Sequence, residues 1–497
     1  MYYSRRAIYT TWINPNSFTC IFYNSHFLLY IFYSSLETSN TKIFASKIGA
    51  ILAAAGSAVG LGNVWRFPTE TGANGGAAFI FIYVLFILLL GVPVMITEFT
   101  IGRHGHKDVM NSFESMANGH KGWKWMGLLP VVAGVLLLSY YAVVAGWTLF
   151  YAYTAGVNGF AGKSAEEYAS DFQVFSTDPV MPCLWMAVIV MMTCGIISFG
   201  VQKGIERGSK IMMPLLFIFI LILVVCSLSL PGAKEGLTFL FRPDFSKVTG
   251  ATVLSAMGQA FFSLSVGLCC LCTYACYFRK DVNLFADGLS VATIDTLVAL
   301  CSGLIIFPAV YSIPDMQPDA GPALVFITLP HVFQTVFGDA PLIAYLFSLL
   351  FYLLLVMAAL TSSISMLEMA SAYFHEEYRV SRPKAALGVS LVCLVLGAFC
   401  SLSFGKWHDV TVFGMGFFDL FDFLVAKFFM PIGSFLMCIF VGWVADKNVV
   451  KDEVTNGGKV GKGIYSVWFF IVRYIAPVLI FLIFINELGV FEFLKKE

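Results

Sequence analysis

The residues best suited to chemistry form a glycine-rich stretch that interrupts an apolar run. Residues 56–63 read Gly-Ser-Ala-Val-Gly-Leu-Gly-Asn and directly follow the apolar residues 48–55. Glycines favour unwinding of a helix and let the backbone approach a ligand closely. Unwound backbone survives in a bilayer only where it is buried in protein or lines a wet cavity, because its carbonyl groups need partners. Ions and polar solutes are such partners, and close packing of helices through small residues is the alternative.

A second stretch of this kind lies in the other half of the chain. Residues 258–268 read Gly-Gln-Ala-Phe-Phe-Ser-Leu-Ser-Val-Gly-Leu inside another apolar segment. Five spans separate the two stretches, and this odd offset gives the two helices opposite orientations. The pattern predicts an inverted repeat of two five-span halves, with a substrate site where the two breaks meet.

Composition sets the class of protein. The chain is 59% hydrophobic and 12% charged, with a mean hydropathy of +0.82, which excludes a soluble globular protein and indicates a polytopic membrane protein. Its 30 basic and 30 acidic side chains balance, so charge gives no case for binding nucleic acid. The cysteines lack metal-ligand spacing and are interpreted as small buried hydrophobes. Without a nucleophile–base pair or a phosphate-binding loop, the chain is not expected to be an enzyme.

About eleven apolar spans position the two broken stretches, each long enough to cross a bilayer. Their predicted limits are 48–72, 77–101, 126–157, 180–200, 211–231, 250–276, 285–312, 340–372, 385–403, 412–444 and 465–490. Lysine and arginine concentrate in the loops after the even-numbered spans, as in 203–210 and 447–462. By the positive-inside rule the N-terminus is cytoplasmic, and an odd number of spans leaves the C-terminus outside.

Four motifs carry a resemblance to a known family. They are Gly-Ser-Ala-Val-Gly-Leu-Gly-Asn-Val-Trp-Arg-Phe-Pro at 56–68, Glu-Phe-Thr-Ile-Gly-Arg at 98–103, Lys-Gly-Ile-Glu-Arg at 203–207 and Thr-Ser-Ser at 361–363. The chain resembles the neurotransmitter:sodium symporter family from about residue 44 to about residue 490. The resemblance implies an all-α polytopic membrane protein with the LeuT fold of the bacterial members. This fold has a five-plus-five inverted repeat and broken helices 1 and 6.

The predicted domains follow from this resemblance. Residues 43–497 form the transporter domain, with repeat one at about 48–231, repeat two at about 250–444 and an extra helix at about 465–490. Residues 1–42 form an atypical N-terminal segment without a clean apolar span of roughly 20 residues. This segment could be an atypical signal or an extra amphipathic segment. The preferred hypothesis is that it precedes the true start, with Leu36 as the initiator.

The resemblance implies two sodium sites. One uses Gly56, Val59, Ala358, Thr361 and Ser362. The other uses Ala58, Asn63, Ser263 and Asp295, together with the carboxylate of the substrate. Taken without the family, the hydroxyls of 361–363 could instead bond to their own helix.

Gly60 stands where the monoamine carriers of the family place an aspartate, so the substrate must supply the carboxylate. An amino acid is therefore a better guess than an amine. The residues expected to contact it are Ser57, Ala58, Leu61, Gly62, Leu137, Tyr141, Phe262, Ser263, Ser265, Leu268, Ser362 and Met366. The side-chain pocket is apolar or neutral, and a charged side chain would be costly there. We expect a neutral, hydrophobic or aromatic L-amino acid, with tryptophan, tyrosine, leucine and methionine as open choices.

Asp295 departs from the asparagine of the best-known bacterial pattern. The chloride site of the animal relatives maps to Tyr83, Gln259, Ser263, Asp295 and Ala299. A carboxylate at Asp295 could replace that anion, which predicts chloride-independent transport. Its proton could also be carried back after sodium release, as a hydrogen-ion antiport step.

Charged residues inside the spans predict the gates, since an intramembrane charge is usually paired. Arg66 and Asp422 form the expected outer gate, bridged by water, with Asp419 as the competing acid. For Lys427 there are two alternatives. Its ammonium group snorkels to the membrane interface, or it pairs with an unidentified carboxylate.

The inner gate is expected at Glu376 and Tyr277. The arginine that the family places near its N-terminus is missing, because Thr41 stands there with Lys42 adjacent. Glu98, Glu206 and Arg207 are expected to fasten helices together and are left out of the sites.

Together these patterns predict a sodium-coupled symporter that imports its substrate by alternating access. It would reside in a bacterial inner membrane, as a monomer or weak dimer, with sodium, the amino acid and the lipid bilayer as its partners. A sensor of the same fold that binds without transport is one alternative. An ion channel or a purely structural helical bundle is another.

Overall fold

The computed structural model describes residues 43–117, 119–313 and 323–489. The predicted N-terminal segment, including Leu36, Thr41 and Lys42, lies outside these residues. Within them the structure contains helices and loops with no β-strand, apart from an isolated bridge between Val412 and Met415.

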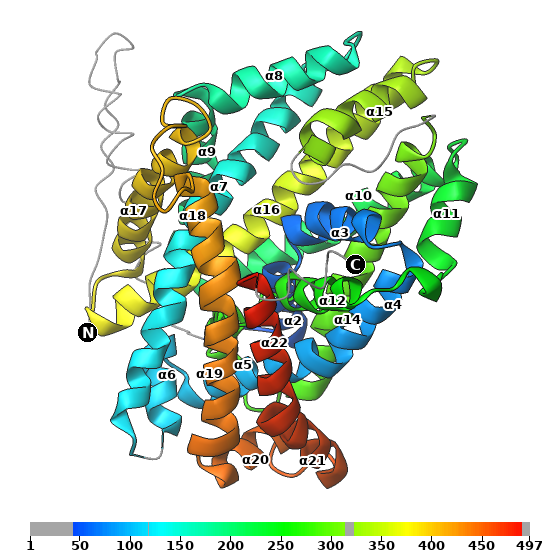
Figure 1. Cartoon of the computed structure of the whole chain (residues 1–497). Coiled ribbons are helices and arrows are strands. Elements are labelled where there is room, and N and C mark those ends of the chain that lie inside the picture. The colour runs from blue at the N-terminus through cyan, green and yellow to red at the C-terminus, as the bar shows by residue number, and fades with distance from the viewer. Residues whose placement is uncertain (1–42, 118, 314–322, 490–497) are drawn as a thin grey trace, which may run out of the picture. The chain divides into compact units, whose positions relative to one another are not determined.

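The helices follow one another as Figure 1 shows. The first half of the described chain contains α2 (Lys47–Ala58), η1 (Gly62–Arg66), α3 (Phe67–Ala73), α4 (Ala77–Phe86), η2 (Ile87–Gly91), α5 (Val92–Gly105), α6 (Val109–Met116), η3 (Lys121–Gly127), α7 (Leu128–Gly156), α8 (Ala165–Thr177), α9 (Met181–Ser198), η4 (Val201–Glu206) and α10 (Arg207–Leu228). The second half contains α11 (Ala233–Phe241), η5 (Phe245–Lys247), α12 (Gly250–Ser263), α13 (Cys270–Ala275), α14 (Leu284–Val310), η6 (Leu324–Thr328), α15 (Leu329–Val336), α16 (Pro341–Glu377), α17 (Arg382–Leu402), α18 (Phe417–Asp422), η7 (Phe423–Phe429), α19 (Met430–Ile439), η8 (Phe440–Val444), α20 (Lys447–Thr455), α21 (Lys462–Phe470), η9 (Ile471–Ile475) and α22 (Ala476–Glu487).

Nine continuous helical stretches of the described chain are long and apolar enough to cross a membrane. The pair Lys47–Ala58 and Gly62–Ala73 makes a tenth, bent by 54°. The span predicted at 250–276 is divided between α12 and α13, so every predicted span meets a helical element. The helix of the fifth predicted span starts at Val201, ten residues before the predicted limit, because it continues through the basic segment. The stretch Phe417–Val444 starts later than predicted because residues before it form a loop.

Polar caps explain where many helices begin. Ser46, Asp108 and Asn283 accept hydrogen bonds from the first-turn amides of α2, α6 and α14. Ser164 and Thr249 form capping boxes at α8 and α12. These side chains satisfy amides that a helix leaves without partners, so the helix ends are fixed outside the apolar segments.

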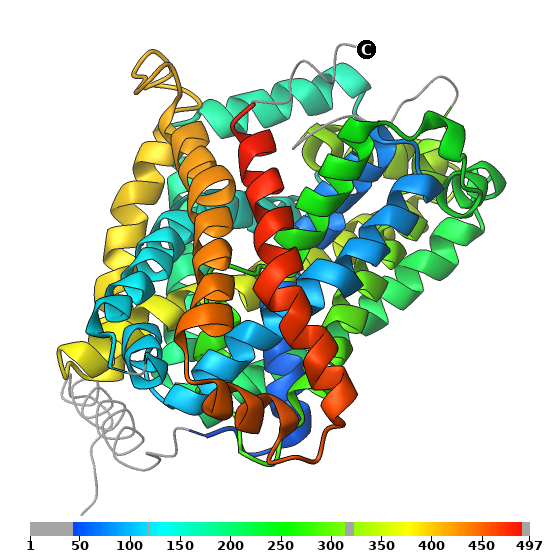
Figure 2. The same cartoon turned by 60° about the horizontal axis from the view of Figure 1, so that its bottom comes forward.

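The two broken segments lie at the centre of the packing. α2 contacts α10, α13, α14 and α16, and α13 packs along α5. The buried face of α2 is made of small residues, including Ala53, Ala54 and Gly56, which lets neighbouring helices approach closely. In Figure 2 the helices α19 and α22 run side by side, in agreement with their contacts.

Candidate substrate and ion site

The first break lies between Ala58, where α2 ends, and the renewed helix at Gly62. Two of its backbone amides bond to side chains. The amide of Gly60 donates to Oδ1 of Asn63 at 2.9 Å, and the amide of Leu61 donates to the Tyr141 hydroxyl at 3.4 Å. The break is therefore stabilised by neutral side chains, one of which comes from α7.

One group of oxygens forms where the break meets α16. The Val59 carbonyl accepts from Ser362 Oγ at 3.1 Å and from Thr361 Oγ1 at 3.5 Å. Thr361 also donates to the carbonyl of Ala358 at 3.0 Å. A Cβ added at Gly56 would lie 3.4 Å from Cβ of Thr361. The structure thus brings together all five residues of the first predicted sodium site, and hard cations prefer such oxygens.

The hydroxyls of α16 differ in what they bond. Ser363 Oγ donates to the Ala359 carbonyl in its own helix at 2.8 Å. Ser362 reaches the other helix, and Thr361 divides its contacts between Met357, Ala358 and the break. The bonding of a hydroxyl to its own helix therefore describes Ser363 but not Ser362.

A second polar group surrounds Asp295, which is fully buried. Asn63 Nδ2 donates to Asp295 Oδ1 at 2.7 Å and to Ser263 Oγ at 3.1 Å. Ser263 Oγ in turn donates to Asp295 Oδ2 at 2.7 Å and accepts from the Tyr83 hydroxyl at 3.2 Å. Ala58, the remaining predicted ligand, is the last residue of α2 and is also buried. The group joins both broken helices to α4 and α14.

The remaining residues mapped to the chloride site are also buried. Gln259 is buried and lies four residues before Ser263 on α12. Neither polar atom of its side-chain amide has a hydrogen-bond partner among the described residues. Ala299 presents only a methyl group, one turn after Asp295 on α14. Asp295 is therefore the acidic member of the mapped set.

A cavity of about 490 Å³ opens next to the first break. Its walls come from both broken helices and from α7, η7, α19 and α22. The lining residues are Leu61, Gly62, Trp65, Arg66, Thr69, Glu70, Leu137, Tyr140, Tyr141, Val144, Gly258, Phe261, Phe262, Phe418, Asp422, Ala426, Lys427, Met430, Pro431, Ile483 and Glu487. Five residues predicted to contact substrate are among them, Leu61, Gly62, Leu137, Tyr141 and Phe262.

The other predicted contacts do not line this cavity. Leu268 and Met366 are buried, and Ser265 lies in the second break with a φ of 51°. The Ser57 hydroxyl is buried without a hydrogen-bond partner in the part of the chain that the structure describes. Ala58, Ser263 and Ser362 lie in the two polar groups instead.

Arg66 and Asp422 both line the cavity, whereas Asp419 does not. Arg66 lies 4.0 Å from Glu70, and its guanidinium stacks 4.1 Å from the centroid of the Phe262 ring. The expected pair thus shares the cavity, with Arg66 turned toward Phe262 and Glu70.

Lys427 has a partner that the sequence did not identify. Its Nζ lies 3.9 Å from Glu487 Oε2 at the end of α22.

Comparisons with known proteins agree with this arrangement. The sequence model of the Sodium:neurotransmitter symporter family matches residues 41–170 and 176–496. The chain belongs to this family. The chain is 39% identical to the uncharacterized sodium-dependent transporter YhdH of Bacillus subtilis (strain 168), over 90% of this chain and 98% of that protein. It is 25% identical to the sodium-dependent serotonin transporter of Drosophila melanogaster, over 93% of this chain and 79% of that protein.

A solved structure is similar as well. The crystal structure of MhsT in complex with L-phenylalanine matches with a TM-score of 0.81 and 41% sequence identity, over 90% of this chain and 99% of that one. The predicted all-helical LeuT fold is confirmed. The chain is a multi-pass, sodium-dependent transporter, and its relatives are transporters rather than enzymes.

A further polar network is centred on Glu368, which is fully buried. The Tyr277 hydroxyl donates to Glu368 Oε1 at 2.6 Å, and Arg382 pairs with the same oxygen. Glu376, predicted as the gate carboxylate, accepts from the amide of Asp108 at 2.7 Å. Tyr277 therefore bonds Glu368, eight residues before Glu376. A lone carboxylate in an apolar span and an arginine at the next helix start were the signals that could have identified this pair.

Glu98 is the other functional residue that the sequence analysis left out of the site. It is fully buried, and its carboxylate accepts from the amide of Gly267 at 2.7 Å and of Cys272 at 3.2 Å. The Gly267 amide lies in the second break and the Cys272 amide in the first turn of α13, and in the break Gly267 has a φ of 97° and Cys269 a φ of 56°. Glu98 is a positioning residue that stabilises the irregular backbone between α12 and α13.

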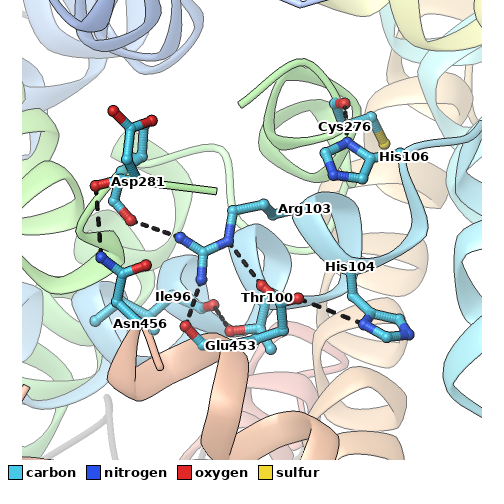
Figure 3. A network of polar contacts seen from close by, with 10 residues as sticks. Ile96, Thr100, Arg103, His104, His106, Cys276, Asp281, Glu453 and Asn456 are labelled. Atoms are coloured by element: carbon cyan, nitrogen blue, oxygen red, sulfur yellow. Dashed lines mark hydrogen bonds and ion pairs between the residues drawn. The ribbon is translucent and has the colours of Figure 1, made fainter. Parts of the chain in front are cut away.

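The end of α5, which carries Glu98, is fastened by a buried arginine (Figure 3). Arg103 Nε donates to Glu453 Oε2 at 2.8 Å, and its Nη1 donates to the Val282 carbonyl at 2.5 Å. Burial acts to raise the pKa of the Glu453 carboxyl, but the hydrogen bond from His104 and the charge of Arg103 lower this pKa to about 2. Glu453 is thus ionised in the folded protein, and its pair with Arg103 connects α5 to α20.

Proposed function

We propose that the chain is a sodium-coupled symporter that imports a neutral, hydrophobic or aromatic L-amino acid by alternating access. Two sodium ions would travel with the substrate. One would be bound by Gly56, Val59, Ala358, Thr361 and Ser362. The other would be bound by Ala58, Asn63, Ser263 and Asp295, with the carboxylate of the substrate as a further ligand.

The observation that carries the proposal is the environment of Gly60. A Cβ at this position would lie 2.5 Å from Ser362 Oγ and 3.3 Å from the Tyr141 hydroxyl. The site therefore has no carboxylate of its own here and no room for one without movement of Ser362. A substrate that brings a carboxylate would complete the site, and the amides at the start of η1 present a positive helix end toward it.

The cavity walls support the choice of side chain. Leu137, Val144, Phe261 and Phe262 supply apolar surface, and the charged residues of the lining are Arg66, Glu70, Asp422, Lys427 and Glu487. A charged side chain placed against the apolar wall would lose its hydration without gaining a partner. The relative MhsT, whose structure contains L-phenylalanine, supports an aromatic substrate. The substrate-contact set remains the predicted one, including Ser57, Ser265, Leu268 and Met366.

Chloride independence rests on Asp295. Its carboxyl group already accepts from Asn63 and Ser263 at 2.7 Å each, so an acidic group of the protein stands at the position mapped to the chloride. Transport should continue when chloride is replaced by gluconate, and an uptake rate that varies with pH would support the hydrogen-ion antiport step.

The gates would be Arg66 with Asp422 on the outer side and Tyr277 with Glu376 on the inner side, in a bacterial inner membrane with a cytoplasmic N-terminus.

Uptake into proteoliposomes tests the proposal. Phenylalanine, tryptophan, tyrosine, leucine and methionine would be offered under an imposed sodium gradient, with a potassium gradient and with lysine as controls. Sodium-dependent accumulation of at least one hydrophobic amino acid is the expected result. Binding without accumulation would instead support a sensor of the same fold. No response to any amino acid would refute the inference drawn from Gly60.

A further inference from the structure

Arg473 lies on the flank of the last span among aromatic rings. It belongs to η9, and its guanidinium carbon lies 4.1 Å from the ring centroid of Trp443, 5.4 Å from that of Tyr474 and 5.9 Å from that of Phe469. Trp443 Nε1 also donates to the Arg473 carbonyl at 3.3 Å. Gly442 permits this approach, because an added Cβ there would lie 3.1 Å from Cα of Arg473.

The arginine lacks an acidic partner. In the part of the chain that the structure describes, no carboxylate forms an ion pair with Arg473, and its Nε is buried without a hydrogen-bond partner. Aromatic faces attract the cation weakly at exposed sites. They accept no N–H bond of the strength that an anion offers. A cation in a membrane span usually has a partner, and the described residues supply no carboxylate for this one.

The surroundings of Arg473 face outward at one membrane interface. Trp443, Tyr474 and Phe470 are 52%, 46% and 56% exposed, so the ring cluster lies on the flank of the helical bundle. Trp443 stands one residue before the end of η8, and α20, which carries Lys447 and Lys451, follows directly. Tryptophan and tyrosine favour this headgroup level of a bilayer. The sequence places this face in the cytoplasm, where anionic lipids attract basic residues.

An apolar groove lies farther along the same two helical stretches, between α19 and α22. It has a volume of about 180 Å³ and is lined by Pro431, Ile432, Phe435, Ile480, Phe481 and Phe484. Phe435 precedes Trp443 by eight residues, and Phe481 follows Arg473 by eight, which is about 12 Å along each helix. The groove therefore starts from the same level on both helices and leads away from the interface.

We propose that Arg473 binds the phosphate of an anionic phospholipid, with Trp443 beside the headgroup and one acyl chain in the groove. A planar guanidinium suits bidentate bonding to phosphate oxygens. The net negative headgroup neutralises a cation that lacks a carboxylate. The groove favours a lipid over free phosphate, because inorganic phosphate has no apolar part to bury there.

Native mass spectrometry of the full-length protein in detergent tests the site. The wild-type chain should retain phosphatidylglycerol at least tenfold better than phosphatidylcholine with the same acyl chains. Arg473→Gln should remove about tenfold of the phosphatidylglycerol retention and leave phosphatidylcholine unchanged. Lys459→Gln is the matched control, because Lys459 is an exposed cation of the same basic face, and its effect should stay within twofold.

Two further arms complete the experiment. Inorganic phosphate at millimolar concentration should not displace the lipid, and displacement would overturn the assignment to a lipid. Equal retention of phosphatidylglycerol by Arg473→Gln and the wild type would also overturn it. If Arg473→Gln does not fold, the wild-type chain still decides, because equal retention of the two lipids by the wild type refutes the proposal.

Discussion

The two broken helices look alike in sequence but are stabilised in different ways. The first break bonds to neutral groups, with Asn63, Tyr141 and Ser362 on its amides and carbonyl. The second break is stabilised by the carboxylate of Glu98, which accepts two backbone amides. A neutral hydroxyl can give up its hydrogen bond to a carbonyl oxygen, and that oxygen can then bind a cation. A buried carboxylate that accepts two amides would leave both amides without an acceptor if it moved.

This difference separates binding from positioning. Leu61 and Gly62 of the first break line the adjacent cavity, and the hydrogen bond of the Leu61 amide to Tyr141 is long, at 3.4 Å. The second break packs so closely that a Cβ at Gly267 would lie 2.5 Å from the Met430 carbonyl. We interpret the first break as the element that binds ions and substrate, and the second as the element that fixes one wall of the site.

The largest effect should come from removing the charge at the second break. Glu98→Leu leaves two buried amides without an acceptor, at about 1.5–3 kcal/mol for each bond to a charged group. We expect a loss of folding stability on the order of 3–6 kcal/mol, measured as residual monodisperse protein after heating in detergent. Glu98→Gln retains one carbonyl oxygen and should lose about half as much. A Glu98→Leu variant that survives heating as the wild type does would remove the distinction between the two breaks.

A medium effect, on ions rather than on folding, should come from the first break. Ser362→Ala removes the hydroxyl that reaches Val59 and should raise the sodium concentration for half-maximal uptake about tenfold, the equivalent of roughly 1.4 kcal/mol. Stability in sodium-free buffer should change by about 1 kcal/mol or less. The adjacent Ser363→Ala is the matched control, because Ser363 bonds its own helix. Equal shifts in both variants would contradict the role assigned to the first break.

The sequence predicted the fold well because its signals are local. Apolar length marked each span, and a glycine-rich stretch marked each break. The observed helix limits differ from the predicted span limits where a helix continues beyond its apolar part, as at Val201 and Glu377. Neither length nor hydropathy reports where a helix with polar ends stops.

Contacts between distant segments were harder to predict. Glu98 and Glu368 are single carboxylates in apolar spans, which the sequence displays, but their partners lie 169 residues and 14 residues away. The two groups of oxygen atoms, at Val59 and at Asp295, were predicted only through the family resemblance. The sequence 361–363 alone does not indicate which hydroxyl bonds to another helix rather than to its own. Lys427 showed the same limitation, because Glu487 lies in another span.

The smallest effect should come from the ion pair between Lys427 and Glu487 in the cavity lining. This pair tests whether the effect of replacing a carboxylate depends on its charge or on its burial. Glu487 is partly exposed and 3.9 Å from a Lys427 that is 42% exposed, so their attraction is worth about 0–1 kcal/mol. Glu487→Gln should therefore alter uptake by less than about twofold, and added salt should remove the remainder. The same substitution at Glu98 should be far more damaging, since that carboxylate is fully buried. Tenfold slower uptake by Glu487→Gln, restored by exchanging the two charges, would instead make this pair a restraint on the opening of the cavity.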